Sequence, residues 1–513
     1  MNGRKSIKSN YIFNVTYQLF ALLVPLIVTP YISRVLGAAS IGYYSYTYSI
    51  VSYFAIFAAL GTGTYGVREV GVSNDKYNQS TSFFNILIFR SLTTLISLVF
   101  YITYSLLFCK NDIVVWLQGL NIVAVIFDIS WFFQGVEDFK KVSIKNFIIK
   151  IISVICVFVF VKSESDLWIY ILCLAGFIVL GNISMWFSLP KYICKVSREH
   201  IRPSKDIKSI GLLFFPTIAI QIYALVDKTL IGTLINETIV VQEPTIVNGV
   251  ETTIDSVVKV SNLENGYYEQ ADKIIKMCSM VVTSLGTVMI PKIASAYRCH
   301  KNKEVSTYLK KSFNFVWLMT VPMCLGIIAI TKDFVPVFFG VGYEKVKILL
   351  PIFSILFVFL GINSVIGNQY LISTGQQGKF SLLLLIGGTV NILLDVILIP
   401  HFYSIGAAIG SIVGETIITV LGLLLLFKTK VCSFKDVFGN CWKYFIGGII
   451  MFVTTFGVSL LLNEFGLAGV LLEVCIGIIS YIIVILLLRD KFLIEMTKPY
   501  LLKVKSRFSK KKQ

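Results

Sequence analysis

Long apolar runs separated by short polar connections recur along the whole chain. Between Tyr11 and Leu488 the runs reach about 20 residues, the length that an α-helix needs to cross a bilayer. The pattern predicts an all-α integral membrane protein with about 14 transmembrane helices. The predicted spans are residues 11–33, 41–62, 83–108, 113–134, 145–161, 167–189, 208–235, 266–290, 309–330, 346–373, 380–399, 406–427, 443–462 and 466–488.

A short sequence pattern occurs twice. Residues 35–37 read Val-Leu-Gly and residues 230–232 read Leu-Ile-Gly, and each is followed by Gly-Tyr-Tyr, at 42–44 and at 266–268. In both copies we expect one apolar helix to end on the first Gly and the next helix to open on the second. A shift of six helices preserves direction, so the pattern predicts two parallel six-helix repeats, the N-lobe and the C-lobe, plus two C-terminal helices.

The spans divide the chain into predicted parts. These are a cytoplasmic N-terminus (1–10), the N-lobe of helices 1–6 (11–190), a cytoplasmic linker (191–207), the C-lobe of helices 7–12 (208–427), helices 13 and 14 (428–488) and a basic cytoplasmic tail (489–513). Within the C-lobe, β-branched residues alternate around Asn248-Gly249, which predicts an outer hairpin insert at about 236–265. The insert is either a tolerated loop extension or a contact for a partner or polysaccharide.

Composition and charge support a membrane protein. The 513 residues are 56% hydrophobic and 14% charged, whereas a soluble protein carries about a quarter charged residues. The net charge of +18 could suggest a nucleic-acid partner, but basic inner loops explain it, and we expect no nucleic acid. Both termini are predicted to be cytoplasmic, because the outer connections hold few basic residues: Arg34, Lys110, Lys162, Lys259, Lys332, Lys345 and Lys347.

Ionisable residues inside the spans are candidates for function, since placing a charged side chain at the bilayer centre costs at least about 2.5 kcal/mol. Asn391 and Asp395 are spaced i, i+4 and share one face of span 11. An amide and a carboxylate there could coordinate a small cation or relay a proton, with Asp227 as a third ligand. Interhelical hydrogen bonds and an Asp–Lys pair are the structural alternative.

Cationic side chains gather around the repeated pattern. Arg34, Lys228 and Lys273 in a water-filled cleft would suit an anionic, phosphate-bearing substrate. They could instead pair with Asp227, with Asp272 or with lipid phosphate.

Other patterns indicate helix packing or argue against nucleotide-binding and metal sites. Gly406, Gly410 and Gly414 are spaced for close helix packing. The run from Gly61 to Gly66 fits G-x-G-x-x-G, but it follows a membrane span, so it predicts a helix break and no dinucleotide site. The chain has no P-loop motif for ATP, and its cysteines and histidines have no metal-site spacing, so no cofactor is expected.

Several stretches together resemble a known family. They are Asn14-Val15-x-Tyr17-Gln18, Pro25-Leu26-x-x-x-Pro30-Tyr31-Ile32-Ser33-Arg34-Val35-Leu36-Gly37, Gly42-x-Tyr44-Ser45-Tyr46, Gln134-Gly135, Asp227-Lys228 and Gly266-Tyr267-Tyr268-Glu269. With them the chain resembles bacterial Wzx-type oligosaccharide flippases, polysaccharide biosynthesis proteins of the multidrug/oligosaccharidyl-lipid/polysaccharide exporter superfamily.

The resemblance implies a fold of two six-helix lobes in a V with two extra helices. It implies a flippase of the bacterial cytoplasmic membrane that moves undecaprenyl-diphosphate-linked oligosaccharide repeat units by alternating access, without ATP, for capsule, O-antigen or exopolysaccharide synthesis. Sodium or a proton would be the coupling ion. Related lipid II flippases bind sodium through residues that Asp227, Asn391 and Asp395 match here, and Ser411 lies where a span 12 hydroxyl would fall. The outer insert departs from the family's short connection.

This interpretation makes the chain a transporter and not an enzyme. Arg34, Lys228 and Lys273 would bind the diphosphate, and membrane lipids and a polysaccharide polymerase would be its partners. One alternative is a drug or metabolite:cation antiporter of the same superfamily. Another is a membrane polysaccharide polymerase, which the outer insert disfavours because it holds a single Lys and no Arg or His.

Overall fold

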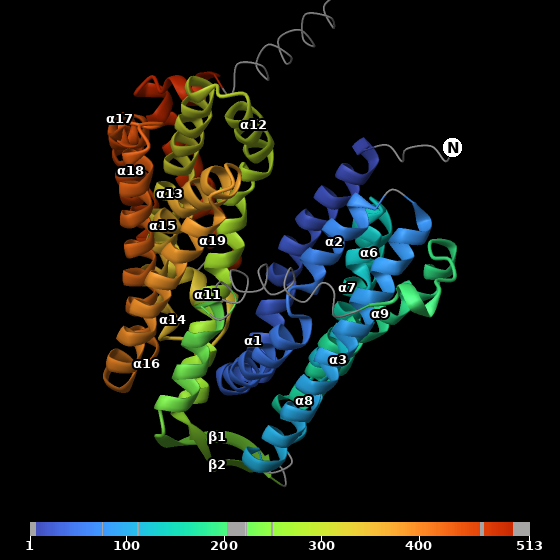
Figure 1. Ribbon diagram of the computed structural model, residues 1–513. Helices are drawn as coiled ribbons and strands as arrows, with labels where there is room; N and C mark the ends of the chain where they lie inside the picture. Colours follow the sequence, from blue (N-terminus) through green and yellow to red (C-terminus); the bar gives the residue numbers. More distant parts are fainter. Residues whose placement is uncertain are drawn as a thin grey trace, which may run out of the picture. The chain divides into compact units, whose positions relative to one another are not determined.

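The computed structural model describes residues 7–73, 75–109, 112–202, 221, 223–247, 250–461 and 466–495 (Figure 1). Among these, ten helical segments are long and apolar enough to cross a membrane. An eleventh is added if the bent pair Val260–Thr283 and Val288–Arg298 forms one crossing. The predicted helical membrane protein is confirmed.

Two of the ten segments are too long for a single crossing. Leu23–Val72 has 50 residues and Gln377–Lys428 has 52, while one crossing takes about 20. The first is kinked at Gly37 and the second at Tyr403, both between predicted spans. The total of about 14 spans stays a prediction. Of the predicted span 208–235, residues 208–220 and 222 lie outside the described residues.

The chain divides into two compact units, Met1–Glu269 and Gln270–Gln513. The first begins with α1 (Ile7–Ala59), whose kink residue Gly37 has φ 71° and ψ 172°, a conformation that is essentially restricted to glycine. Gly61, at φ 70°, then separates α1 from α2 (Thr62–Val72). The G-x-G-x-x-G run therefore breaks a helix, as predicted.

The next helices of the first unit are interrupted more often than the hydropathy pattern suggests. They are α3 (Lys76–Phe108), α4 (Ile113–Gln118), α5 (Leu120–Phe127), α6 (Ser130–Gly135), α7 (Phe139–Phe160), α8 (Leu167–Ile171) and α9 (Phe177–Trp186), with a π-helical turn at Leu172–Gly176. α4, α5 and α6 together occupy one predicted span, 113–134, and α5 and α6 are separated at Asp128 and Ile129.

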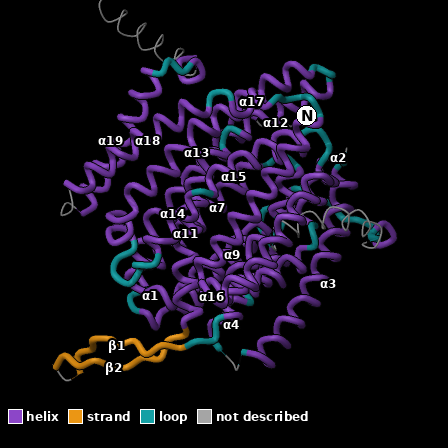
Figure 2. The backbone as a smooth tube through the Cα atoms, turned by 90° about the vertical axis from the view of Figure 1, so that its left-hand side faces the viewer, coloured by secondary structure: helices purple, strands orange, loops and turns teal. Residues whose placement is uncertain are grey.

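A β-hairpin joins the last two helices of the first unit. Residues 223–234 are helical, and β1 (Thr238–Val247) then pairs antiparallel with β2 (Val250–Lys259), with Val247 opposite Val250. Figure 2 shows the two strands in orange. The turn at Asn248-Gly249 lies outside the described residues. α11 (Val260–Thr283) follows directly, so residues 260–265 of the predicted insert are helical.

The second unit continues α11 and adds a bundle around a large apolar core. Its elements are α12 (Gly286–Arg298), α13 (Asn302–Phe338), α14 (Val346–Ser354), α15 (Leu356–Asn363), a π-helical stretch (Ser364–Ile372), α16 (Gln377–Lys428), α17 (Phe434–Phe438), α18 (Cys441–Leu461) and α19 (Gly466–Leu487). Buried polar groups in this core bond to backbone: Trp317 Nε1 donates to the carbonyl of Val437 at 2.8 Å, and Tyr481 Oη to that of Leu318 at 2.9 Å.

The two halves of α16 fold back on each other at Tyr403. A β-carbon at Gly406 would lie 2.6 Å from the carbonyl oxygen of Leu398, and one at Gly387 would lie 2.3 Å from Ile418 Cγ1. Small residues let the two helical backbones approach, because any side chain there would collide. The predicted packing role of the glycine stripe is confirmed.

Candidate functional site

The two copies of the repeated pattern contact each other within the first unit. A β-carbon at Gly42 of α1 would stand 1.7 Å from the carbonyl oxygen of Asn262 on α11, and one at Gly266 would stand 2.0 Å from that of Ala38. These distances leave no room for a side chain, so only glycine fits at either position. We call this contact of Ala38 and Gly42 with Asn262 and Gly266 the α1–α11 contact.

Beside the α1–α11 contact lies a network of buried charged and polar groups. Lys228 Nζ forms an ion pair with Glu269 Oε2 at 2.5 Å, and the two side chains are 11% and 16% exposed. Ser45 Oγ donates to the same carboxylate oxygen at 2.9 Å. The Tyr268 hydroxyl donates to Oδ2 of the buried Asp227. Helix 223–234, α1 and α11 therefore share one charged network.

The sequence predicted Asp227 and Lys228 but not their partners. Tyr268 belongs to the repeated Gly-Tyr-Tyr, and Glu269 and Ser45 belong to the stretches that resemble the family, but none of the three was predicted to contact Asp227 or Lys228. One feature of the sequence could have indicated Glu269 as the partner of Lys228. It is the acidic residue directly after the repeated Gly-Tyr-Tyr, in the helix that follows the one carrying Lys228.

Arg34 and Lys273 are placed differently from Lys228. Arg34 is exposed on α1, three residues before the kink, and its Nη1 donates to the carbonyl of Pro30 at 3.1 Å. Lys273 is half-buried on α11, one turn after Glu269 and beyond the boundary of the first unit. The prediction that both act with Lys228 stays a prediction.

A cavity of about 450 Å³ lies between α1 and the helix that carries Lys228. It is lined by small and polar residues such as Ser52, Thr64 and Gln221, together with the exposed ring of Tyr48. Near it, Thr229 Oγ1 hydrogen-bonds Ser49 Oγ and Tyr53 Oη, each at 2.9 Å. Hydroxyl groups and an aromatic face are suited to contact with sugars.

In the second unit, the predicted Asn391 and Asp395 are both 0% exposed. The fold-back of α16 places Gly410 against them: a β-carbon there would stand 2.2 Å from Asp395 Oδ1 and 3.2 Å from Asn391 Nδ2. Ser411 follows and is also buried. Oxygen donors of this kind suit a hard cation such as sodium.

A second buried polar cluster lies along the half of α16 that carries Gly410 and Ser411. The predicted ion site did not include this cluster. Asn363 Nδ2 donates to Glu415 Oε2 at 2.6 Å, and Thr419 Oγ1 donates to Asn363 Oδ1 at 2.9 Å. Asn363 ends α15, immediately before the π-helical stretch. Glu415 in an apolar run was a visible signal, but nothing in the sequence indicated its partner.

The break between α5 and α6 is held by buried side chains of other helices. Arg90 Nε donates to the carbonyl of Val125 at 2.8 Å, and its Nη2 pairs with Asp128 at 3.3 Å. Asn182 Nδ2 donates to the carbonyl of Ala124 at 2.9 Å. The Ala124 and Val125 carbonyls, which share the single backbone N–H of Asp128 at the end of α5, thus gain side-chain donors from α3 and α9, so Arg90 and Asp128 have a structural role.

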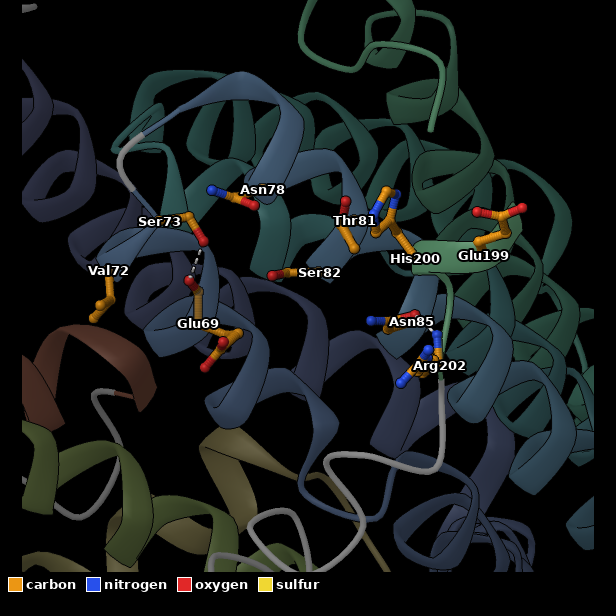
Figure 3. Close-up of a pocket in the computed structure, with 10 residues that line it drawn as sticks. All are labelled: Glu69, Val72, Ser73, Asn78, Thr81, Ser82, Asn85, Glu199, His200 and Arg202. Atoms are coloured by element: carbon orange, nitrogen blue, oxygen red, sulfur yellow. Dashed lines mark hydrogen bonds between the residues drawn. The ribbon is translucent and has the colours of Figure 1, made fainter. Parts of the chain in front are cut away.

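Figure 3 shows another cavity, of about 580 Å³, where α2 and α3 meet residues 199–202. Its lining mixes Glu69 and Glu199 with His200 and Arg202. The backbone N–H of Arg202 donates to Asn85 Oδ1 at 2.7 Å, and His200 Nδ1 hydrogen-bonds Tyr77 Oη at 2.8 Å. These bonds fasten the segment after α9 to α3, away from every predicted site residue.

Comparison with known families gives two matches. A family model described as "Polysaccharide biosynthesis protein" matches residues 7–297, and a second model with the same description matches residues 254–348.

Known proteins resemble the chain over much of its length. It is 24% identical to an Escherichia coli (strain K12) protein named "Putative O-antigen transporter", over 84% of this chain and 99% of that one. It is 21% identical to the "Probable low-salt glycan biosynthesis flippase Agl15" of Haloferax volcanii, over 43% of this chain and 46% of that one.

Solved structures share the fold. The lipid II flippase MurJ in an inward closed conformation superposes with a TM-score of 0.67, at 17% identity, over 96% of this chain and 100% of that one. An inward-facing multidrug resistance MATE family transporter of the MOP superfamily gives a TM-score of 0.56, at 12% identity, over 80% and 98%.

Proposed function

The chain belongs to the polysaccharide biosynthesis protein family, and we propose that it is a flippase for lipid-linked oligosaccharides. Its substrate is an undecaprenyl-diphosphate-linked repeat unit, moved from the inner to the outer leaflet of the bacterial cytoplasmic membrane. The relative named as an O-antigen transporter and the MurJ-like fold support this class of function. The chain is a membrane transporter and not an enzyme.

The observation that carries the proposal is the buried Lys228–Glu269 pair at the repeated pattern. A lysine removed from water needs an anionic partner, and here Glu269 provides it. Phosphate oxygens offer the same charge-assisted hydrogen bonds as a carboxylate. The substrate diphosphate replaces Glu269 at Lys228, and Arg34 and Lys273 add positive charge.

A coupling ion drives the cycle, because the chain has no ATP-binding motif. Asp395, Asn391 and Ser411 supply oxygen donors from the two halves of α16. Sodium fits these donors, and a proton on a carboxylate is the alternative. Each ion provides energy only if its binding differs between the two states of the carrier.

The α1–α11 contact is the reversible closure of the outer side. Both helices meet there through bare backbone, and their separation breaks the hydrogen bond from Ser45 to Glu269. Counting α1 and α16 as two crossings each, the bent pair of α11 and α12 as one crossing and the predicted span 208–235 as another gives 14 spans, an even number that puts both termini in the cytoplasm. The hairpin lies outside, where it contacts a polysaccharide polymerase.

The test compares neutral replacements of two ion pairs in proteoliposomes loaded with a labelled undecaprenyl-diphosphate oligosaccharide. Lys228→Met alone would leave Glu269 buried without its cation, at a cost of about 3–5 kcal/mol. The test variant is therefore Lys228→Met with Glu269→Gln. The control is Lys276→Met with Asp272→Asn, which removes the 2.7 Å pair further along α11.

We expect the Lys228/Glu269 variant to fold and to flip the lipid at least about tenfold more slowly, since about 1.4 kcal/mol of diphosphate binding is lost. The control should keep the wild-type rate. A Lys228/Glu269 variant that flips at the wild-type rate would refute diphosphate recognition by Lys228. Cation-driven efflux of a dye with no lipid flipping would instead favour the antiporter.

A further inference from the structure

The cavity of about 450 Å³ between α1 and the helix that carries Lys228 has a lining of small, uncharged residues. It follows one face of α1 from Tyr48 to Ala59, which is about 16 Å of helix, and ends at Gly61 and Gly63, where α1 is followed by α2. None of the described residues that line it carries a charge. The cavity therefore has room for an elongated and uncharged group.

The ring of Tyr48 forms part of the cavity wall and is supported by two further rings. Tyr48 is 40% exposed, and its ring stacks on that of Tyr44 with the centroids 5.7 Å apart and the planes at 19°. Tyr44 contacts Tyr170 edge to face at 5.3 Å. These contacts hold the Tyr48 ring in one orientation, and because Tyr44 covers one of its faces, the other face is left for a ligand.

Polar groups of the lining add hydrogen-bonding capacity. Within the part of the chain that the structure describes, the side chains of Thr64 and Gln221 and the hydroxyl of Tyr48 have no hydrogen-bond partner. Ser52 Oγ donates to the carbonyl of Tyr48 at 2.6 Å and keeps its lone pairs as acceptors. Hydroxyl and amide groups donate and accept, as sugar hydroxyls do, and the negative face of an aromatic ring attracts the C–H groups of a sugar ring.

The cavity begins one helical turn from the charged network. Tyr48 follows Ser45 by three residues on α1, which is about 4.5 Å along the helix axis. Leu225, also in the lining, precedes Lys228 by the same interval on the neighbouring helix. A diphosphate at Lys228 would thus place the sugar joined to it beside Tyr48. An acidic sugar would bring a carboxylate into an uncharged cavity, and burying an unpaired charge costs free energy.

We propose that this cavity binds the sugar joined directly to the diphosphate, that Tyr48 stacks on its ring, and that uncharged sugars are selected over acidic ones. The position next to the diphosphate rests on the proposed flippase function. The preference for uncharged sugars follows from the cavity lining. Tyr48 is thus a specificity-determining residue, and further sugars of the repeat unit lie along α1 toward Gly61.

Three undecaprenyl-diphosphate lipids test the proposal, carrying glucose, glucuronic acid or no sugar. The two sugars differ only in that a carboxylate replaces a hydroxymethyl group. Binding to the full-length protein in detergent is measured by microscale thermophoresis, and flipping is measured in proteoliposomes. We expect the glucosyl lipid to bind at least about tenfold more tightly than the glucuronosyl lipid, or by about 1.4 kcal/mol, and to be flipped faster.

Variants of the cavity separate the sugar from the rest of the lipid. Tyr48→Ala should weaken binding of the glucosyl lipid at least about tenfold and leave binding of the sugar-free lipid unchanged, whereas Tyr48→Phe, which keeps the ring, should retain most of the affinity. Ala224→Leu narrows the cavity and should act like Tyr48→Ala. Tyr77→Ala is the control, since Tyr77 is similarly exposed, at 37%, on α3.

The outcomes distinguish the cavity from transport. Equal affinity of the wild type for the glucosyl and glucuronosyl lipids would overturn the selection of uncharged sugars. Equal weakening of all three lipids by Tyr48→Ala would show that the ring contacts the hydrocarbon chain, and would overturn the sugar site. Sugar-selective binding without flipping of any lipid would support the sugar site and refute the proposed flippase function.

Discussion

Single residues decide whether the buried polar groups of α16 can work as an ion site. Asp395 and Asn391 are completely buried, and Gly410 on the opposite half of the helix leaves them their space. A methyl group at Gly410 would stand 2.2 Å from the Asp395 carboxylate. The Asp395 side chain would have to move, because a carboxylate oxygen cannot lie that close to a methyl carbon.

We therefore expect Gly410→Ala and Asp395→Asn to have the same functional effect by different routes. The first displaces the carboxylate, and the second removes its charge. Both should reduce the dependence of flipping on a sodium or proton gradient at least about tenfold, or about 1.4 kcal/mol of coupling. The measurement is flipping in proteoliposomes with each gradient imposed in turn.

Gly378→Ala is the matched control, since Gly378 belongs to the same helix and a β-carbon there would have no neighbour within 4 Å. It should behave as wild type. Asp395→Asn protein that still responds fully to both gradients would exclude Asp395 as the coupling residue.

At the scale of elements, α1 and α11 pack closely because each helix has a glycine where the two backbones meet. Gly42 and Gly266 occupy equivalent positions of the repeated pattern, and each faces backbone of the other helix. Spacing of small residues by four, as in Ala38 and Gly42, is typical of close packing between membrane helices. The two copies of the pattern thus form one contact surface.

Gly266→Ala should disrupt the α1–α11 contact, because the new β-carbon would lie 2.0 Å from the carbonyl oxygen of Ala38. Overpacking of this kind costs about 1–3 kcal/mol. We expect thermal unfolding in detergent at a lower temperature and increased labelling of a cysteine placed at Ser45.

Gly63→Ala on α2 is the control, since a β-carbon there would meet nothing within 4 Å. It should leave both measurements unchanged. Equal thermal stability and equal labelling in Gly266→Ala and wild type would show that the α1–α11 contact is not formed in the membrane.

For the whole molecule, the hairpin connects the two helices that hold the charged network. It is closed at its base by the backbone N–H of Val260, which donates to the carbonyl of Glu237 at 2.9 Å. Farther along the strands, Val240 and Val257 face each other across them and are 61% and 72% exposed. An isolated two-stranded ribbon is marginally stable in water, so a partner would stabilise it.

Replacing residues 240–257 by a two-residue Asn-Gly turn should leave flipping within about twofold of wild type, since shortening a surface loop changes its closure entropy little. In cells the same protein should yield shorter polysaccharide chains, because contact with the polymerase is lost. Chain length is read on gels.

Val240→Thr with Val257→Thr keeps the hairpin and tests the apolar pair by itself. Normal chain length after removal of residues 240–257 would contradict a polymerase contact. Loss of flipping would show that the hairpin positions Lys228 and Glu269 directly.

The sequence by itself determined that this is a helical membrane protein, where most helices lie and which residues put charge at membrane depth. A bilayer forces each crossing segment to satisfy its own backbone hydrogen bonds, so length and hydropathy suffice for that prediction. Asp227, Lys228, Asn391 and Asp395 were visible as exceptions to an apolar pattern.

Only the tertiary structure decided what these residues touch. The pairing of Lys228 with Glu269, the fold-back that sets Gly410 against Asp395, and the cavity at Tyr48 all join residues distant in the chain. The kinks at Gly37 and Tyr403 lie between predicted spans, but the sequence did not show that the two halves of α16 contact each other. The hydropathy of a segment indicates whether that segment can cross the lipid bilayer. Which side chains of different helices contact each other depends on how the helices pack, and the sequence of one helix does not determine that.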